Sequence, residues 1–298
     1  MVFVGEALLE LSRRDRAWHL GYGGDTLNTA IHLARQGCET AYLTAIGSDP
    51  LSAELEEGWR AEGLSTELVL THPTRATGLY AINTDDEGER SFTYWREASA
   101  ARAMFALPGI EEALARARAA DLLGFSLISL AVLDDAARDR LLSLARDVRS
   151  RGGKVAFDGN YRPRLWTSPG EARVWRDRAI ACADFGLPTL DDELALGASD
   201  AAAVAAHWQA LGCGETVVKL GAKGCRLPDG RTVKPERVLE PIDTSGAGDA
   251  FDAGYLGARL GGTSPLDAAR AGHARAAWTI MRAGGIPAQE ALSPHEVD

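Results

Sequence analysis

The sequence predicts an α/β fold with a mostly parallel sheet, and two observations lead to this class. Apolar runs of about five residues, the length of a buried strand, alternate along the chain with longer stretches of helical periodicity. The chain has 298 residues and 46% hydrophobic residues, which is ample for a core in one large domain. We treat residues 1–298 as a single domain.

The elements follow from these runs in order. Residues 27–36 show the helical pattern most clearly, because Leu27, Ala30, Ile31 and Ala34 share one face and Gly37 ends it. Further helices are expected at 51–62, 109–118, 134–150, 169–182, 199–211, 250–256 and 264–282. Strands are expected at 1–11, 40–46, 122–125, 155–158, 184–187 and 216–219.

One region departs from the alternation. Residues 78–83 and 91–96 resemble strands and flank the polar turn 84–89, with no long helix between them. This pattern predicts an antiparallel hairpin. It either covers a site as a flap or serves as a purely structural edge hairpin.

Composition excludes several classes of function. The formal charge of −10 argues against nucleic acid as the main partner, although a locally basic pocket remains compatible with it. No apolar run approaches the ~20 residues of a membrane span, and the N-terminus reads as a strand without a charged leader. The four cysteines lack CxxC spacing, so we expect reduced thiols in a cytosolic protein, and the six histidines show no paired metal spacing.

The string at 242–251 is the most informative motif. Gly246 and Gly248, with Ala247 between them, allow a tight turn whose amides and following helix suit a phosphate. Asp249 lies at the same point, where a carboxylate can accept a proton from a hydroxyl that attacks phosphorus. The third glycine of a dinucleotide-binding loop and the Gly-Lys-Ser/Thr of a Walker A loop are absent. The alternative is a glycine-rich connection with Asp249 as a helix cap.

A second glycine-rich string opens the helix near residue 27. Gly23 and Gly24 free the backbone, and Asp25 and Asn28 offer hydrogen-bonding groups suited to sugar hydroxyls. Asp25 could equally be the N-cap of that helix.

The expected hairpin carries a possible anion contact. Tyr94 and Arg96 are two residues apart on one strand and share a face, and Tyr80 lies on the partner strand. If this face covers the site, Arg96 can form a bidentate pair with a substrate carboxylate. Otherwise it is an amphipathic surface side chain.

Two further loops follow core strands. Asn160 and Arg162 come after the strand at 155–158, and Pro163 keeps Arg162 out of helical geometry. Their alternative role is to anchor the loop. Lys219 begins a turn with Gly221, Lys223 and Gly224 that is either a nucleotide contact or an ordinary β-turn.

These strings, in this order, resemble the signatures of the ribokinase-like (PfkB) carbohydrate kinases over residues 5–287. The resemblance implies a three-layer α/β/α sandwich with a mostly parallel central sheet and a small β-lid from about 8–22 and 65–100. In that family the lid closes over the sugar and often forms the dimer contact, so we expect a homo-oligomer through the lid.

The resemblance also implies roles for the residues. Asp249 matches the catalytic base, the turn Gly246–Gly248 matches the anion hole, and Arg162 matches an arginine that reaches substrate and phosphates. ATP is the expected cofactor, with Mg²⁺, and a monovalent-cation requirement stays open. The residues that match the family's nucleotide contacts are Asn160, Lys219, Gly221, Lys223, Gly224, Thr244, Gly246 and Gly248.

One motif differs from the family pattern. Many members carry Asn-x-x-Glu where this chain has Thr189-Leu190-Asp191-Asp192. Asp192 keeps a carboxylate for organising Mg²⁺, but the asparagine is missing, so no metal ligand is assigned.

Within the family, the strings at 23–29 and 160–166 resemble those of 2-keto-3-deoxygluconate kinases. This implies ATP-dependent phosphorylation of a sugar acid at its C6 hydroxyl, giving 2-keto-3-deoxy-6-phosphogluconate and ADP. Gly23, Gly24, Asp25, Asn28, Tyr80, Tyr94, Arg96, Arg162 and Asp249 are the expected substrate contacts. The alternatives are a fructokinase or other kinase of a neutral sugar, and a non-catalytic sugar- or nucleotide-binding protein.

Overall fold

The computed structural model describes residues 1–14, 17–84, 90–237 and 239–289. Its centre is a seven-stranded sheet in which every pair of neighbouring strands is parallel. The strand order is β11-β10-β9-β8-β1-β4-β5. These strands are β1 (Val2–Val4), β4 (Ala41–Ile46), β5 (Val69–Thr71), β8 (Leu122–Ser126), β9 (Lys154–Asp158), β10 (Phe185–Gly186) and β11 (Glu215–Thr216).

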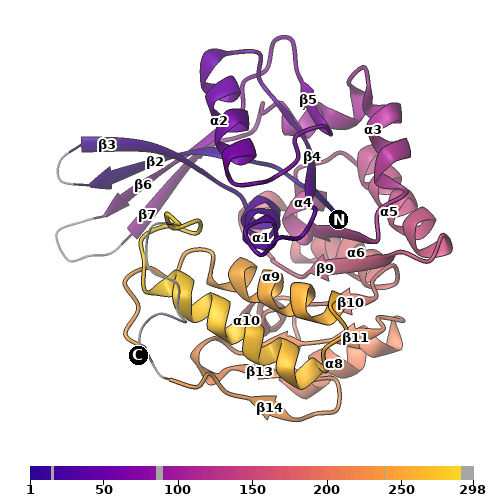
Figure 1. Cartoon of the computed structure of the whole chain (residues 1–298). Helices are drawn as coiled ribbons and strands as arrows, with labels where there is room; N and C mark the ends of the chain where they lie inside the picture. The colour runs from indigo at the N-terminus through magenta and orange to yellow at the C-terminus, as the bar shows by residue number, and fades with distance from the viewer. Residues whose placement is uncertain (15–16, 85–89, 238, 290–298) are drawn as a thin grey trace.

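Helices cover both faces of this sheet (Figure 1). Successive strand side chains point to opposite faces, so Val2 and Val4 join one apolar cluster while Phe3 joins the other. The second cluster includes α1 (Asp25–Ala34), α2 (Pro50–Ala61), α9 (Ala247–Leu260) and α10 (Pro265–Ile280). The first includes α3 (Ile110–Ala117), α4 (Leu127–Ala131), α5 (Asp135–Ser150), α6 (Pro169–Ile180) and α8 (Ala201–Ala210). The predicted three-layer sandwich is confirmed.

A four-stranded sheet extends away from this body, at the left of Figure 1. Its strands are β3 (Ala17–Gly23), β2 (Leu8–Arg14), β6 (Gly78–Thr84) and β7 (Arg90–Trp95), in that order. We call this sheet the lid. The predicted hairpin is its β6–β7 pair, and the tip of the turn, residues 85–89, lies outside the described residues.

The lid differs from the sequence expectation in two places. The single strand predicted at 1–11 is divided, because Gly5 and Glu6 separate β1 in the central sheet from β2 in the lid. Residues 69–71, which we expected in the lid, form β5 at the edge of the central sheet.

Register gives the lid two chemically different faces. One face of the lid, which we call the outer face, is defined by residues that are partners across all four strands: Tyr22, Leu9, Leu79 and Trp95. By alternation along β3 and β2, the same face carries Trp18, Leu20 and Leu11. The opposite, inner face carries the residues between them in sequence. These include Glu10, Tyr80, Ile82, Phe92 and Tyr94.

The strand predicted at 216–219 is also divided. β11 ends the parallel sheet at Thr216, and β12 (Val218–Lys219) begins a small antiparallel sheet with β13 (Cys225–Arg226) and β14 (Thr232–Val233). Short elements that the periodicity did not indicate are α4, α7 (Leu190–Ala195), η1 (Ala101–Ala106), η2 (Pro163–Leu165) and η3 (Gly221–Lys223). No helix among the described residues is long and apolar enough to cross a membrane.

Candidate active site

Asp249 lies in the first turn of α9, beside the N-terminal part of α1. Its side chain is buried, with 9% of the residue exposed, and Asn28 Nδ2 donates to Asp249 Oδ2 at 2.7 Å. Thr29 Oγ1 donates to the Asp249 carbonyl at 3.2 Å. Two residues on one turn of α1 thus fix the backbone and the carboxylate of Asp249.

The residue that caps α9 is Gly246, so the alternative that Asp249 caps the helix is wrong. Gly246 has a φ of 69°, and an added Cβ would lie 2.6 Å from Gly285 Cα, so both conformation and space favour glycine. No side chain among the described residues caps this helix. The Ala247 amide donates to the Thr244 carbonyl at 3.3 Å, whereas the Gly248 and Asp249 amides have no bond to another described residue and remain available to an anion at the positive end of the helix.

Burial has a large effect on the Asp249 carboxyl. Its pKa is raised to about 7, mainly by burial and then by the Asp25 and Asp158 carboxylates, while the Asn28 hydrogen bond and Lys219 lower it. Near neutral pH the carboxyl therefore exchanges a proton readily, which is the property of a general base.

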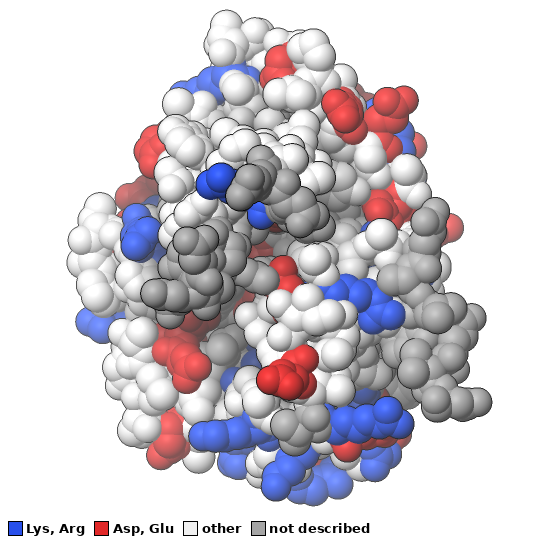
Figure 2. Space-filling model, turned by 90° about the vertical axis from the view of Figure 1, so that its left-hand side faces the viewer, with Lys and Arg blue, Asp and Glu red and all other residues white. Residues whose placement is uncertain are grey.

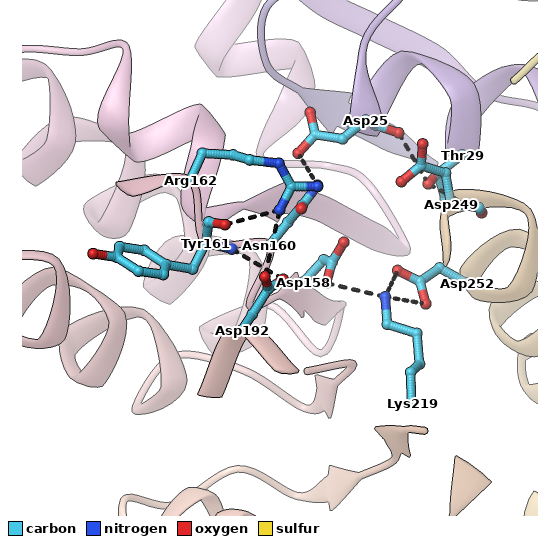
Figure 3. Close-up of polar contacts among 10 residues, drawn as sticks. All are labelled: Asp25, Thr29, Asp158, Asn160, Tyr161, Arg162, Asp192, Lys219, Asp249 and Asp252. Carbon is cyan, nitrogen blue, oxygen red and sulfur yellow. Dashed lines mark hydrogen bonds and ion pairs between the residues drawn. The ribbon is translucent and has the colours of Figure 1, made fainter. Parts of the chain in front are cut away.

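The predicted substrate and nucleotide residues on the neighbouring loops lie close to one another (Figure 3). Asn160 Nδ2 donates to Asp25 Oδ2 at 3.1 Å. Asp25 is the first residue of α1 and Gly24 is the cap, so the alternative that Asp25 is the N-cap is wrong. Gly24 has a φ of 153°, and a Cβ added there would lie 2.5 Å from the Glu6 carbonyl oxygen. Because glycine has no side chain, the loop before α1 can lie close to the β1–β2 junction.

Arg162 is half exposed at the rim of the site. Its Nη1 donates to the Tyr161 carbonyl at 2.8 Å and lies 3.5 Å from Asp192 Oδ1. Asp192 Oδ2 also accepts from the Tyr161 amide at 3.3 Å. Asp192 therefore orients the loop that carries Arg162, and the exposed guanidinium can still reach an anion.

Lys219 is placed differently from our expectation. The prediction was an ATP contact, but the side chain is buried and Nζ donates to Asp158 Oδ1 at 3.1 Å and to both Asp252 oxygens at 3.0 and 2.9 Å (Figure 3). An ammonium has three donors, and these contacts use them. Of the other residues predicted in this nucleotide turn, Gly221 and Lys223 are exposed and Gly224 is buried against the Val233 carbonyl. Thr244 is exposed.

Arg96 also has a partner that the sequence did not reveal. Its Nε donates to Glu6 Oε2 at 2.7 Å, Nη2 donates to the same oxygen, and Ser99 Oγ donates to Glu6 Oε1. Both Arg96 and Glu6 are buried. In this arrangement, two of the nitrogens expected to bind a substrate carboxylate are bonded to Glu6.

The inner face of the lid is aromatic. Tyr80 and Tyr94 stack with ring centroids 5.8 Å apart, and Phe92 stacks on Tyr94 at 6.4 Å. Tyr80 OH donates to Glu10. A Cβ added at Gly23 would lie 2.5 Å from the Tyr80 hydroxyl, so this face adjoins the loop before α1. The pKa of Tyr80 is raised by burial, then by Glu10, Tyr94 and Asp249. Figure 2 shows the face of the molecule toward which the lid extends, with Lys and Arg gathered at its lower end.

Four acidic residues of this region were missed as site residues in the sequence: Glu6, Glu10, Asp158 and Asp252. Two had a usable signal. Asp252 is three residues after Asp249 and therefore shares its helix face, and Glu10 is a polar residue between the apolar Leu9 and Leu11. Among the described residues, no group of three or more His, Cys, Asp or Glu side chains is arranged to hold a metal ion.

Comparison with known proteins shows the family to which the chain belongs. Residues 2–292 match the family described as pfkB family carbohydrate kinase. The chain is 42% identical to the 2-dehydro-3-deoxygluconokinase of Escherichia coli K12, covering 97% of each chain, and 39% identical to that of Dickeya dadantii, covering 98% of each. A fructokinase of Vibrio alginolyticus is 30% identical, covering 78% of this chain and 75% of its own length.

Solved structures share the fold. A PfkB protein from Polaromonas superposes with a TM-score of 0.84 at 27% identity, covering 96% of both chains. A fructokinase from Xylella fastidiosa, solved with bound ATP, has a TM-score of 0.84 at 23% identity and covers 96% of this chain and 94% of its own.

Proposed function

Since this chain belongs to the pfkB family of carbohydrate kinases, we propose that it phosphorylates 2-keto-3-deoxygluconate (2-dehydro-3-deoxygluconate) at the C6 hydroxyl, using ATP. The observation that carries the mechanism is the buried Asp249 carboxylate at the start of α9, held by Asn28 and beside uncapped amides. Its full-length relatives from Escherichia coli and Dickeya dadantii, named for this activity, support the substrate.

In the proposed reaction, Asp249 accepts the proton of the C6 hydroxyl as that oxygen attacks the γ-phosphorus in line. The amides of the Gly246–Gly248 turn and the guanidinium of Arg162 stabilise the charge that develops on the transferred phosphoryl group. Closure of the lid over the sugar excludes water that would otherwise hydrolyse ATP.

For the nucleotide, the supporting features are an uncapped helix start and exposed polar groups around it. Thr244, Gly221 and Lys223 are exposed. Asn160 lies in the loop after β9 and donates to Asp25. Mg²⁺ would be held mostly by phosphate oxygens and water. Asp192 is the carboxylate of the family's metal-organising segment, and its bond to the Tyr161 amide keeps it in the site.

For the sugar acid, we assign the inner face of the lid together with the Gly23–Gly24 turn. Tyr80 and Tyr94 stack on each other and offer hydroxyl groups, and Asp25 and Asn28 on α1 are held by Asn160 and Asp249. Arg96, 5.7 Å from the Tyr94 ring centroid, and Arg162 supply the positive charge for the carboxylate.

We also propose that the outer face of the lid pairs two copies of the chain. Trp18, Leu20 and Trp95 share this face and are 53%, 44% and 55% exposed. Large apolar side chains gathered on one sheet face usually mark an association surface. The partner that fits a sheet of this kind is a second copy of the same lid.

The substitution Asp249→Asn tests the proposed base. We expect kcat to fall by a factor on the order of 10² or more with little change in sugar binding, because only proton acceptance is lost. In the wild-type protein, kcat/KM should rise with pH through about 7, the pKa of Asp249, since the base acts in its ionised form. Steady-state ADP release and calorimetric sugar binding measure both quantities, and wild-type turnover in the variant would contradict the assignment.

A further inference from the structure

The ammonium of Lys219 joins three elements whose ends meet at the site. Asp158 is the last residue of β9, Lys219 is the last of β12, and Asp252 lies one turn after Asp249 on α9. The bonds from Nζ to these two carboxylates are all between 2.9 and 3.1 Å long. All three side chains are at least mostly buried.

We propose that Asp252 and Lys219, with Asp158, form a buried clamp that holds the first turns of α9 against the ends of β9 and β12 and sets the charge beside Asp249. Asp252 and Lys219 are thus positioning residues for the base. The proposal rests on the proposed function for its catalytic consequence, but the clamp itself can be tested without turnover.

The positional part follows from the helix. Asp249 and Asp252 are three residues apart and share a face of α9, so a bond that fixes one also fixes the rotation of the other. The same helix start supplies the amides proposed for the phosphoryl group. Releasing the clamp should therefore disturb the base and the anion hole together.

The electrostatic part follows from the balance of charge. With both carboxyls ionised, two carboxylates and one ammonium give the clamp one net negative charge. Burial raises the pKa of Asp158 and of Asp252, and the Lys219 ammonium opposes this by favouring their ionised forms. Asp25, Asp158 and Asp252 line one small cavity of about 20 Å³, so only about one water can screen them. The other titratable groups that face Asp249 are Asp25 on α1 and Tyr80 in the lid, the latter bonded to Glu10.

Removing one carboxylate from the clamp makes it neutral, which should ease ionisation of Asp249. We expect Asp252→Asn to move the titration of Asp249 to lower pH by about half a unit to one unit. Asp252→Glu keeps the negative charge, so Asp249 should titrate in that variant at the same pH as in the wild-type protein. Asp158→Asn makes the same charge change from the strand side, so it replaces Asp252→Asn if that variant does not fold.

The titration of Asp249 is measured through the pH dependence of the unfolding free energy, with no substrate present. Because the pKa of Asp249 is raised in the folded protein, its contribution to stability is complete below its unfolded pKa and is lost as pH rises through about 7. The difference in unfolding free energy between the wild-type chain and Asp249→Asn therefore changes with pH. The upper end of that change marks the pKa of Asp249 in the folded protein, and we call this pH the titration midpoint. It is measured once from the wild-type chain and Asp249→Asn, and once from Asp252→Asn and its double variant with Asp249→Asn.

Glu215→Gln is the matched control. Glu215 bonds Tyr255 and Arg259, which also belong to α9 but to its far half. This substitution breaks an ion pair on the same helix and should leave the midpoint in place. An acid limb of kcat/KM that moves in parallel with the midpoint would link the clamp to catalysis.

The outcomes separate clearly. A midpoint that falls in Asp252→Asn or Asp158→Asn, but not in Glu215→Gln, supports the clamp. An unchanged or rising midpoint overturns it, whatever happens to activity. If the wild-type protein phosphorylates no sugar, the proposed function fails while the stability measurement still decides the clamp.

Discussion

Asp249 and Arg96 show how much a single side chain depends on its partners. Asp249 has an unusually high pKa because α9 and α1 bury it near Asp25, and this makes it suitable as a base near neutral pH. Arg96 is instead paired with Glu6, whose own pKa is raised by burial. Under the proposed function, the guanidinium of Arg96 would have two tasks, to hold the lid through Glu6 and to bind the substrate carboxylate.

The substitution Arg96→Leu separates these two roles. If Arg96 recognises the substrate carboxylate, kcat/KM should fall at least tenfold for acid sugars and much less for fructose. Glu6→Gln is the matched control, since it breaks the same ion pair and leaves the arginine. Equal losses on acid and neutral sugars in Arg96→Leu would show that the arginine acts only by tying the lid to Glu6.

At the level of elements, the proposed binding of the phosphoryl group depends on the start of α9. Gly246 adopts a left-handed conformation and packs against Gly285. The loops that carry these two glycines are also joined by the Asp243 carboxylate, which accepts from the Ser245 and Gly284 amides at 2.8 Å each. The helix thereby begins at a fixed point, and no side chain of a described residue caps it.

Gly246→Ala should therefore destabilise the protein by about 1–2 kcal/mol from the left-handed conformation alone, with more from the contact with Gly285. Gly248→Ala is the control, because its Cβ would lie 3.6 Å from Lys219 Nζ, an ordinary contact, and alanine is the better helix former. Thermal unfolding and kcat for the two variants test this. Equal stability of both would argue against a strained, tightly packed Gly246.

At the scale of the whole molecule, the parallel sheet brings distant motifs to one edge. The sequence was sufficient for this architecture, because apolar strands and periodic helices alternate, and it was sufficient for the β6–β7 hairpin. The boundary at Val217 was missed because the apolar run continues across it, and the one at Gly5 and Glu6 because apolar residues resume directly after them. In both places the strands on either side join different sheets.

The position of Asp249 at the start of a helix was predictable from one local motif. Contacts between residues far apart in the sequence were not predictable in this way. Glu6 and Arg96 are 90 residues apart, and Lys219 and Asp158 are 61 apart. No local pattern reports such pairings. The sequence therefore does not indicate that Arg96 is bonded to Glu6, or that Lys219 is bonded to Asp158 and Asp252.

The outer face of the lid allows a test of assembly. Leu20→Asp places a charge among the exposed apolar side chains of that face and should convert a dimer to a monomer. His19→Asp is the control, because its register places it on the opposite face of the same strand. Light scattering after size-exclusion chromatography gives the mass, and a monomeric wild-type chain or equal behaviour of both variants would refute pairing through this face.

The most direct test of the proposed function is ADP release with Mg·ATP and a panel of sugars. The panel contains 2-keto-3-deoxygluconate, 2-keto-3-deoxygalactonate, gluconate, fructose and ribose. We predict that kcat/KM for the 2-keto-3-deoxy acids exceeds that for fructose and ribose by a factor on the order of 10² or more, because a paired carboxylate distinguishes them. Preference for fructose or ribose would contradict the substrate and leave the base in place, and no turnover with any sugar would contradict the kinase itself.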